Sequence, residues 1–443
     1  MSTSWTRRNS VRLSIVLLFA VTSVAASMQL EGVLQVTHYD AYLEPKLAAR
    51  TISGSVTLTL EDGPAVAGVV RLQKGDLTID AVAQDSEPLL FETAGQTLTI
   101  HVRATRVRPR RVTVKYHGAP RAGLVFMPER QQMYTSFSTS RWMVAADAPD
   151  ARATFHLELV VPRGWAVVAN GREVARRPLS ESEDVSEWRQ ETPVPSYTFG
   201  FASGEYSSVV DREGGIASRY LANGFSQPEL RRVFTETSRM LKFFADKAGV
   251  PYPGDSYTQV LVPKTAGQEM AAFAVVSEEY GRALLADPSV VSLLAHELAH
   301  QWWGNMVTCR DWTHFWLNEG FATFMAAAYR EHRFGREVYL QDVAAMRARY
   351  DRVRNAGHDR ALVFPNWDAP TADDRTLVYQ KGGYVLHLLR EALGDELFWA
   401  GMQRYTQTHF GQSVTTDDFR RTIESSSGRD LTAFFAEWVY PVR

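Results

Sequence analysis

The sequence changes its hydrophobic pattern part-way along the chain. From about residue 31 to residue 205, short segments alternate apolar with polar residues, and Gly, Pro, Asn and Asp separate them. Such alternation is typical of β-strands with one buried face, and the separating residues are typical of turns. After about residue 288 the apolar residues recur at helical spacing. We therefore expect a multidomain α+β protein in which an N-terminal antiparallel β domain, a sandwich or saddle-shaped sheet, precedes a mainly helical domain.

The change of pattern places a domain boundary close to residue 205. We assign residues 28–205 to the β domain and residues 206–443 to the second domain. A chain of 443 residues is long enough for each of them to bury its own core.

The start of the second domain has less regular patterning than its end. Apolar residues at helical spacing predict a helix over residues 227–249, which Gly249 would end. The segments "SYTQVLVP" (256–263) and "FAVVSEEY" (273–280) predict two strands.

The first residues have the pattern of an export signal. A basic leader precedes the apolar run "LSIVLLFAVTSVAA" of 14 residues, and small residues follow in "VAAS". We interpret residues 1–27 as a signal peptide, so the mature chain would be periplasmic or secreted, and tethered if the signal is kept. No other apolar stretch reaches 18 residues, so we expect no membrane span in the mature chain.

The overall composition excludes some classes of partner and of stabilisation. A formal net charge of -2 gives no electrostatic reason to expect binding to nucleic acid or to an anionic membrane. Cys309 is the single cysteine, so no intrachain disulfide can form. We expect Cys309 to be a small buried apolar residue.

The segment "AHELAH" (295–300) is the strongest candidate for a metal site. Asp287 followed by proline and serine predicts the start of a helix, and Gly304 predicts its end. His296 and His300 would leave the same helical face, where two neutral imidazoles can bind one Zn²⁺ at about 2.0–2.1 Å. Glu297 would point slightly around the helix, near enough to take a proton from a bound water. The alternative is a buried helix whose histidines only make hydrogen bonds.

A third ligand is available in "WLNEGFATF" (316–324). Glu319 lies nineteen residues beyond His300, in the first turn of a predicted helix over about residues 316–331. An unpartnered carboxylate on that apolar face would be costly, and one Zn²⁺ per chain would be its partner. Helix capping by Glu319 is the alternative.

These segments together resemble the zinc aminopeptidases of the aminopeptidase N type, a gluzincin family that includes the leukotriene hydrolases. The resemblance covers about residues 35 to 441. The segments that carry it are "YDAYLEPKLAARTISGSVTLTLE", "WMVAADAPDARATFHLELVVP", "SYTFGFASGEY", "HELAHQWWGN", "WLNEGFATF", "VYQKGGYVLHLL", "HFGQSVTTDDFRRTIE" and "FFAEWVYP".

The resemblance implies a thermolysin-like zinc metallopeptidase domain after the β domain, and it implies roles for single residues. His296, His300 and Glu319 match the zinc ligands of the family, and Glu297 matches its general base. Tyr379 in "VYQKGG" matches the tyrosine that contacts the tetrahedral intermediate, where a phenol can stabilise a transient oxyanion.

The segments that recognise the substrate amine in this family are altered here. The family carries Gly-x-Met-Glu-Asn where this chain has "AGQEMAAF". A one-residue deletion places Glu269 on the amine-binding glutamate, whereas an ungapped alignment places Met270 there. We prefer Glu269, because a carboxylate can pair with an ammonium. The second amine anchor of the family corresponds to Ser136 and Ser138, and an acidic position on its second helix corresponds to Ala326.

The family also implies an activity and a shape for the cleft. We expect a zinc metallopeptidase that removes N-terminal residues from peptides. Most relatives continue into a helical domain that covers the active site, so a chain ending at Arg443 predicts a more open cleft. The alternatives are an endopeptidase or relaxed peptidase of the same fold and a non-catalytic zinc-containing scaffold. The side-chain preference, the physiological peptide and the oligomeric state stay open.

Overall fold

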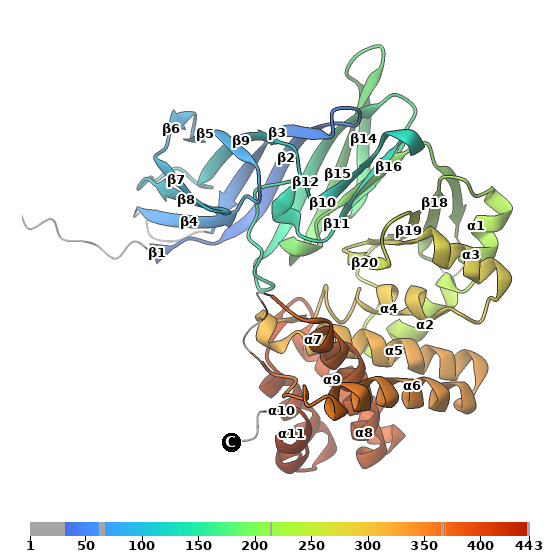
Figure 1. The fold of residues 1–443 in the computed structure, drawn as a ribbon. Coiled ribbons are helices and arrows are strands. Elements are labelled where there is room, and N and C mark those ends of the chain that lie inside the picture. Colours follow the sequence, from blue (N-terminus) through green and yellow to red (C-terminus); the bar gives the residue numbers. More distant parts are fainter. Residues whose placement is uncertain (1–31, 62–66, 213–214, 365–366, 368, 441–443) are drawn as a thin grey trace, which may run out of the picture.

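The computed structural model describes residues 32–61, 67–212, 215–364, 367 and 369–440, and Figure 1 shows their arrangement. The predicted signal peptide, residues 1–27, lies outside these ranges. Within them, no helix is both long enough and apolar enough to cross a membrane.

The N-terminal half of the chain is built on an eight-stranded sheet in the order β14-β15-β12-β2-β3-β9-β5-β6. Two four-stranded sheets, β1-β4-β8-β7 and β10-β11-β16-β13, share its core. The strands are β1 (Gly32–Val33), β2 (Val36–Lys46), β3 (Thr51–Leu60), β4 (Gly68–Gln73), β5 (Thr78–Gln84), β6 (Glu87–Pro88), β7 (Phe91–Ala94), β8 (Thr97–Val102), β9 (Arg111–Gly118), β10 (Gly123–Met127), β11 (Gln132–Ser136), β12 (Arg152–Pro162), β13 (Ala166–Ala169), β14 (Arg172–Pro178), β15 (Glu183–Pro195) and β16 (Phe201–Gly204). Three short 3-10 turns are η1 (Pro128–Arg130), η2 (Thr139–Arg141) and η3 (Ser196–Thr198).

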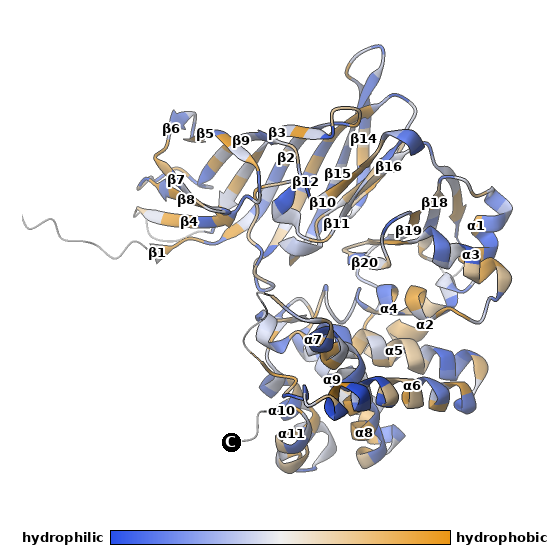
Figure 2. Cartoon of the chain, in the orientation of Figure 1, coloured by the Kyte–Doolittle hydropathy of each residue, from blue (hydrophilic) through white to orange (hydrophobic). Residues whose placement is uncertain are grey.

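Most neighbouring strands of this half are antiparallel, as the alternating pattern predicts. Two pairs, β2 with β12 and β1 with β4, are parallel, which the alternating pattern did not predict. Parallel pairing requires a long connection, and the chain between β2 and β12 supplies one by passing through the smaller sheets. Figure 2 shows apolar and polar residues alternating along the strands of the large sheet.

The second half begins with a five-stranded sheet in the order β17-β18-β19-β21-β20, and helices follow. Its elements are β17 (Ser207–Asp211), β18 (Ala217–Ala222), α1 (Gln227–Val233), α2 (Thr237–Ala248), β19 (Ser256–Val262), β20 (Gly267–Met270), β21 (Phe273–Ser277), α3 (Glu278–Ala286), α4 (Ser292–Ala299), β22 (Thr308–Cys309), η4 (Trp312–His314), α5 (Trp316–Phe334), α6 (Arg336–Asn355), α7 (Ala372–Thr376), η5 (Leu377–Lys381), α8 (Gly382–Leu393), α9 (Asp395–His409), β23 (Ser413–Val414), α10 (Thr416–Ser427) and α11 (Thr432–Trp438). Figure 1 shows this helical part below the β domain, with α4 and β20 between them.

The helix predicted over residues 227–249 is two helices, α1 and α2. Ser226 and Glu229 form a capping box at the start of α1, and Gly249 follows α2 in a left-handed conformation. Between the two helices, the buried Glu236 accepts hydrogen bonds from Tyr329 Oη (2.6 Å) and Arg333 Nε (2.9 Å). We attribute the break to these contacts with α5, which local propensity does not show.

Three other predicted boundaries are wrong, and one of them is the end of the motif helix, which ends at Ala299 and does not continue to Gly304. The strand predicted over 273–280 ends at Ser277, because this serine accepts hydrogen bonds from Glu279 N and Tyr280 N and thereby caps α3. The motif helix α4 begins at Ser292 rather than after Asp287, whose side chain accepts from Ser289 N (2.9 Å) in a local turn instead. Helix α4 ends at Ala299, and its last turn is continued by His300 N donating to His296 O (3.3 Å), so the spacing of the two histidines is kept.

The two halves of the molecule share hydrophobic contacts. The core of the β domain includes residues from the five-stranded sheet of the second half, namely Val260, Val262, Met270, Phe273 and Val275. The other face of that sheet packs on the helices. Strand β20 is therefore an edge strand placed at the junction of the β domain and α4.

Candidate active site

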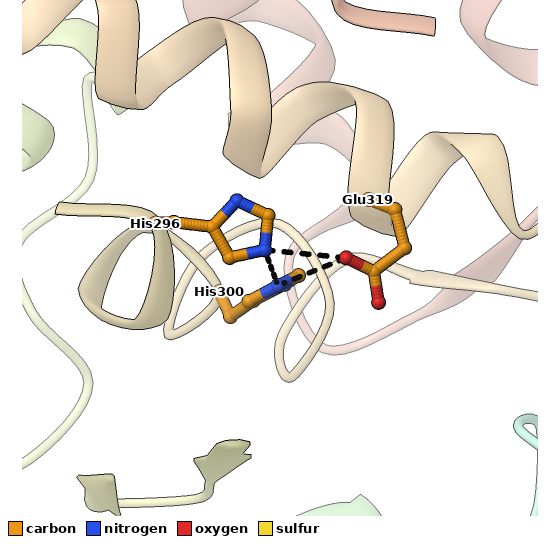
Figure 3. Close-up of side chains that lie close together, drawn as sticks. All are labelled: His296, His300 and Glu319. Carbon is orange, nitrogen blue, oxygen red and sulfur yellow. Dashed lines mark hydrogen bonds and ion pairs between the residues drawn. The ribbon is translucent and has the colours of Figure 1, made fainter. Parts of the chain in front are cut away.

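Three side chains from α4 and α5 converge on one point (Figure 3). His296 Nε2 lies 3.1 Å from His300 Nε2 and 3.2 Å from Glu319 Oε2. His300 Nε2 lies 3.5 Å from the same oxygen. Ligand atoms around a tetrahedral Zn²⁺, at about 2.0–2.1 Å from the ion, are separated by about 3.3 Å. The spacing of these three atoms therefore fits one zinc ion.

Hydrogen bonding also prepares these atoms as metal ligands. His300 Nδ1 lies 3.0 Å from Trp303 O, and because a carbonyl can only accept, this nitrogen carries the hydrogen and Nε2 is left with its lone pair. Glu319 Oε2 is buried and accepts no well-formed hydrogen bond from the part of the chain that the structure describes. A buried carboxylate oxygen facing two imidazole nitrogens is stabilised by a bound cation.

The charged groups around His300 also favour a bound cation. Glu269, Glu297 and His300 place ligand atoms within 4.8 Å of one another, next to Glu319. Burial raises the pKa of Glu269 to about 7. Burial, followed by the charge of Glu269, raises the pKa of Glu297 well above its ordinary value. Burial alone would lower the pKa of His300, but Glu319 and the other two carboxylates raise it to about 10. The cluster therefore favours positive charge at its centre, which two neutral imidazoles and a divalent cation would supply.

Strand β20 presents alternate side chains to opposite sides. Gly267 and Glu269 face the cavity that contains the three convergent side chains, whereas Met270 packs in the core of the β domain. Of the two residues that alternative alignments place at the amine-binding position, it is Glu269 whose carboxylate lies in the site. A Cβ on Gly267 would lie 2.2 Å from Glu297 Oε1, so a larger residue there would displace the end of the Glu297 side chain.

Tyr379 reaches the same cavity from η5, a single wider turn of π-helix between α7 and α8. Its ring stacks on the ring of His296, with centroids 5.7 Å apart and planes 9° apart. Burial raises the pKa of Tyr379 well above its ordinary value, and the neighbouring carboxylates add to the effect. The phenol therefore remains a hydrogen-bond donor beside the metal ligands.

The cavity has a volume of about 590 Å³. Residues that the sequence did not single out also line it, and they include Phe137, Gly267, Tyr280, Leu293, Thr323, Arg330, Asp342, Met346, Arg349 and Gln380. Arg330 and Asp342 form an ion pair across α5 and α6. No sequence motif marks Arg330 and Asp342, because the two become neighbours only when α5 and α6 pack together.

The serines predicted at the second amine anchor are not among the residues that line this cavity. Ser136 Oγ lies 3.5 Å from Thr265 Oγ1, and Ser138 directly precedes η2. Between them, Phe137 does line the cavity, with 58% of its surface exposed. Ala326 lies in the cavity wall, and Cys309 is buried, as expected.

Comparisons with known proteins agree with this architecture. The family model described as "Peptidase family M1 domain" matches residues 233–438, and the "Peptidase M1 N-terminal domain" model matches residues 35–198. Aminopeptidase N of Lactococcus lactis subsp. lactis is 25% identical over 91% of this chain and 51% of its own length. The chain thus spans about half the length of this curated relative.

Solved structures show the same fold. An M1 zinc metallopeptidase mutant from Deinococcus radiodurans, bound to a Tyr-Ser-Ala substrate, is 24% identical with a TM-score of 0.75, over 92% of this chain and 94% of that one. Native yeast LTA4 hydrolase is 20% identical with a TM-score of 0.79, over 92% of this chain and 68% of that one. The β-rich domain, the helical domain and both family models lead to one conclusion: the chain belongs to peptidase family M1.

Proposed function

We propose that this protein is a zinc-dependent aminopeptidase, which hydrolyses the N-terminal residue from peptides. The observation that carries the proposal is the convergence in one cavity of three atoms that could bind a metal ion with two further buried carboxylates, Glu297 and Glu269. The M1 relatives named above support it, since one is an aminopeptidase and another was solved with a peptide substrate.

His296, His300 and Glu319 would hold one Zn²⁺ per chain. When bound, this ion would polarise the scissile carbonyl and lower the pKa of a water molecule to about 7. Glu297 takes the proton of the attacking water and later delivers it to the nitrogen of the leaving peptide. Its burial suits this role, because a raised pKa makes the carboxylate a better proton acceptor.

Two further residues act on the substrate. Tyr379 donates its phenolic hydrogen to the oxyanion that develops on the scissile carbonyl, a charge present only transiently. Glu269 pairs with the α-ammonium group of the substrate and so fixes which peptide bond reaches Glu297. Ser136 and Ser138 do not line the cavity, whereas Glu269 on β20 does. We therefore assign the contact with the substrate ammonium to Glu269.

A peptide-library digest tests the proposal. The purified protein is incubated with the library, with and without a chelator, and the products are identified by mass spectrometry. We expect stepwise loss of N-terminal residues that the chelator abolishes and added zinc restores. Cleavage within peptides would support an endopeptidase instead. Zinc retention without any cleavage would support a scaffold.

The role of Glu269 has its own test. The Glu269→Gln variant is assayed on a free-amine substrate and on its N-acetylated twin. A charge-assisted hydrogen bond contributes about 1.5–3 kcal/mol, so kcat/KM for the free amine should fall about 10- to 100-fold. An unchanged preference for the free amine would show that the amine is bound elsewhere.

We also propose that the protein is exported by the signal at residues 1–27, as its charge and apolar pattern suggest. Cell fractionation and N-terminal sequencing of the recovered protein test this. Recovery in the cytoplasm with an intact N-terminus would contradict it.

A further inference from the structure

The short turn between β20 and β21 carries the amine-binding candidate and is held from both domains. Glu269 is followed by Met270, the last residue of β20, and then by the turn residues Ala271 and Ala272. Ala272 has a φ of 72°, a left-handed conformation that a non-glycine residue adopts at a cost. Such a conformation persists where its surroundings fix it. Strand β20 pairs only with β21 among the described strands, so its register depends on this turn.

In the catalytic domain, the amide side chain of Gln301 makes hydrogen bonds to the backbone on both sides of the turn. Gln301 directly follows the metal-ligand candidate His300 and is 2% exposed. Its Oε1 accepts from Ala272 N (2.9 Å), and its Nε2 donates to Met270 O (3.0 Å). The backbone beside Glu269 is thereby tied to the residue after the zinc motif.

From the β domain, a second amide holds the middle of the same turn. Asn170 follows β13 and is 1% exposed. Its Nδ2 donates to Ala271 O (2.9 Å) and to Thr198 O (2.9 Å), while its Oδ1 accepts from Gly200 N (2.7 Å). Ala271 N in turn donates to Thr198 O (3.3 Å).

We propose that Gln301 and Asn170 are positioning residues that clamp this turn and thereby fix the distance between Glu269 and Glu297. The proposal rests on the proposed aminopeptidase function. Under it, the junction of the two domains determines that the first peptide bond, and no other, is presented to the general base. Displacement of a substrate by about 1 Å can reduce the rate about 100-fold, so loss of either amide should affect the reaction.

The test compares Asn170→Ala and Gln301→Met with the wild-type protein. The readout is the ratio of kcat/KM for a free-amine substrate to that for its N-acetylated twin. We expect the ratio to fall at least about ten-fold in each variant, mainly through a higher KM for the free amine. A purely structural defect would lower both rates together and leave the ratio unchanged.

A matched control comes from the same kind of bond elsewhere. Gln403 Nε2 donates to Asp246 O (2.8 Å) and joins α9 to α2, away from the turn. Gln403→Met should leave the ratio at the wild-type value. Zinc content and melting temperature are measured for all three variants, because Gln301 is adjacent to His300.

A measurement on the unaltered protein covers the case in which neither variant folds. Hydrogen exchange should show the amides of Ala271 and Ala272 protected as strongly as those in the middle of β21, although they lie in a turn at a sheet edge. Rapid exchange there would overturn the clamp. A wild-type protein that does not prefer free amines would refute the proposed function, whereas an intact preference in folded, zinc-loaded variants would refute only the clamp.

Discussion

The metal-ligand face of α4 and α5 and the β20–β21 turn lie against each other, yet they are specified differently. On α4, helical geometry alone places His296 and His300 on one face. The position of Glu269 depends instead on an edge strand, a left-handed alanine and amides from both domains. Under the proposed function, the comparison teaches that the residues for bond cleavage are specified largely by local helix geometry, whereas the choice of bond depends on contacts between distant segments.

The largest expected effect lies on the helical side. Glu297→Gln removes the proton acceptor but none of the three ligand atoms, so kcat should fall by about 10²- to 10⁴-fold while zinc content stays unchanged. Steady-state kinetics and metal analysis measure the two quantities. Glu396→Gln, at an exposed position at the start of α9, is the control. Turnover near the wild-type value would exclude Glu297 as the base.

Tyr379→Phe tests whether the phenol acts in the transition state. The ring can still stack on His296, so the site should keep its shape. Loss of one oxyanion donor typically lowers kcat by about 10²- to 10³-fold with little change in KM. Tyr384→Phe, one helical turn further along and outside the cavity wall, is the matched control. A rise in KM alone would assign Tyr379 to ground-state binding.

Gly267→Ala tests the contact between these two regions, strand β20 and helix α4. The added methyl group would lie 2.2 Å from Glu297 Oε1, so the turn and the base cannot both keep their places. We expect kcat to fall about 100-fold, as for a displaced catalytic group. In a Glu297→Gln background the same change should cost little more, because the base is already lost. Additive losses in this double-mutant cycle would show that Gly267 acts independently of Glu297.

The smallest effect concerns the part of the cavity supplied by the β domain. Phe137 is 58% exposed and lines the cavity, and its N–H donates to the side chain of Gln268 on β20. Phe137→Ala should lower kcat/KM by about 3- to 10-fold for substrates with a large apolar first residue, because part of that contact is lost. Substrates that begin with alanine should change little. Leu179→Ala, an exposed apolar position of the β domain, is the control.

The sequence predicted the order of the two domains and the elements with strong periodicity. The helix predicted over about 316–331 is observed as Trp316–Phe334, because its apolar face is continuous. The break between α1 and α2 was not predictable, since Glu236 is held by Tyr329 and Arg333, about a hundred residues away. The parallel pairing of β2 with β12 was also not predictable. Alternation shows which side chains share a face of a strand, but it does not show which distant strand lies beside it.

By itself, the sequence identified the residues to which the proposed chemistry is assigned. Residue type and helical spacing made His296, His300, Glu297 and Glu319 candidates, but only the packing of α5 on α4 brings Glu319 to the two histidines. Tertiary structure alone decided which residue of "QEM" faces that centre, and which amides hold it there. The physical reason is that a one-residue shift in a strand reverses every side chain, and only packing against a second domain fixes that register.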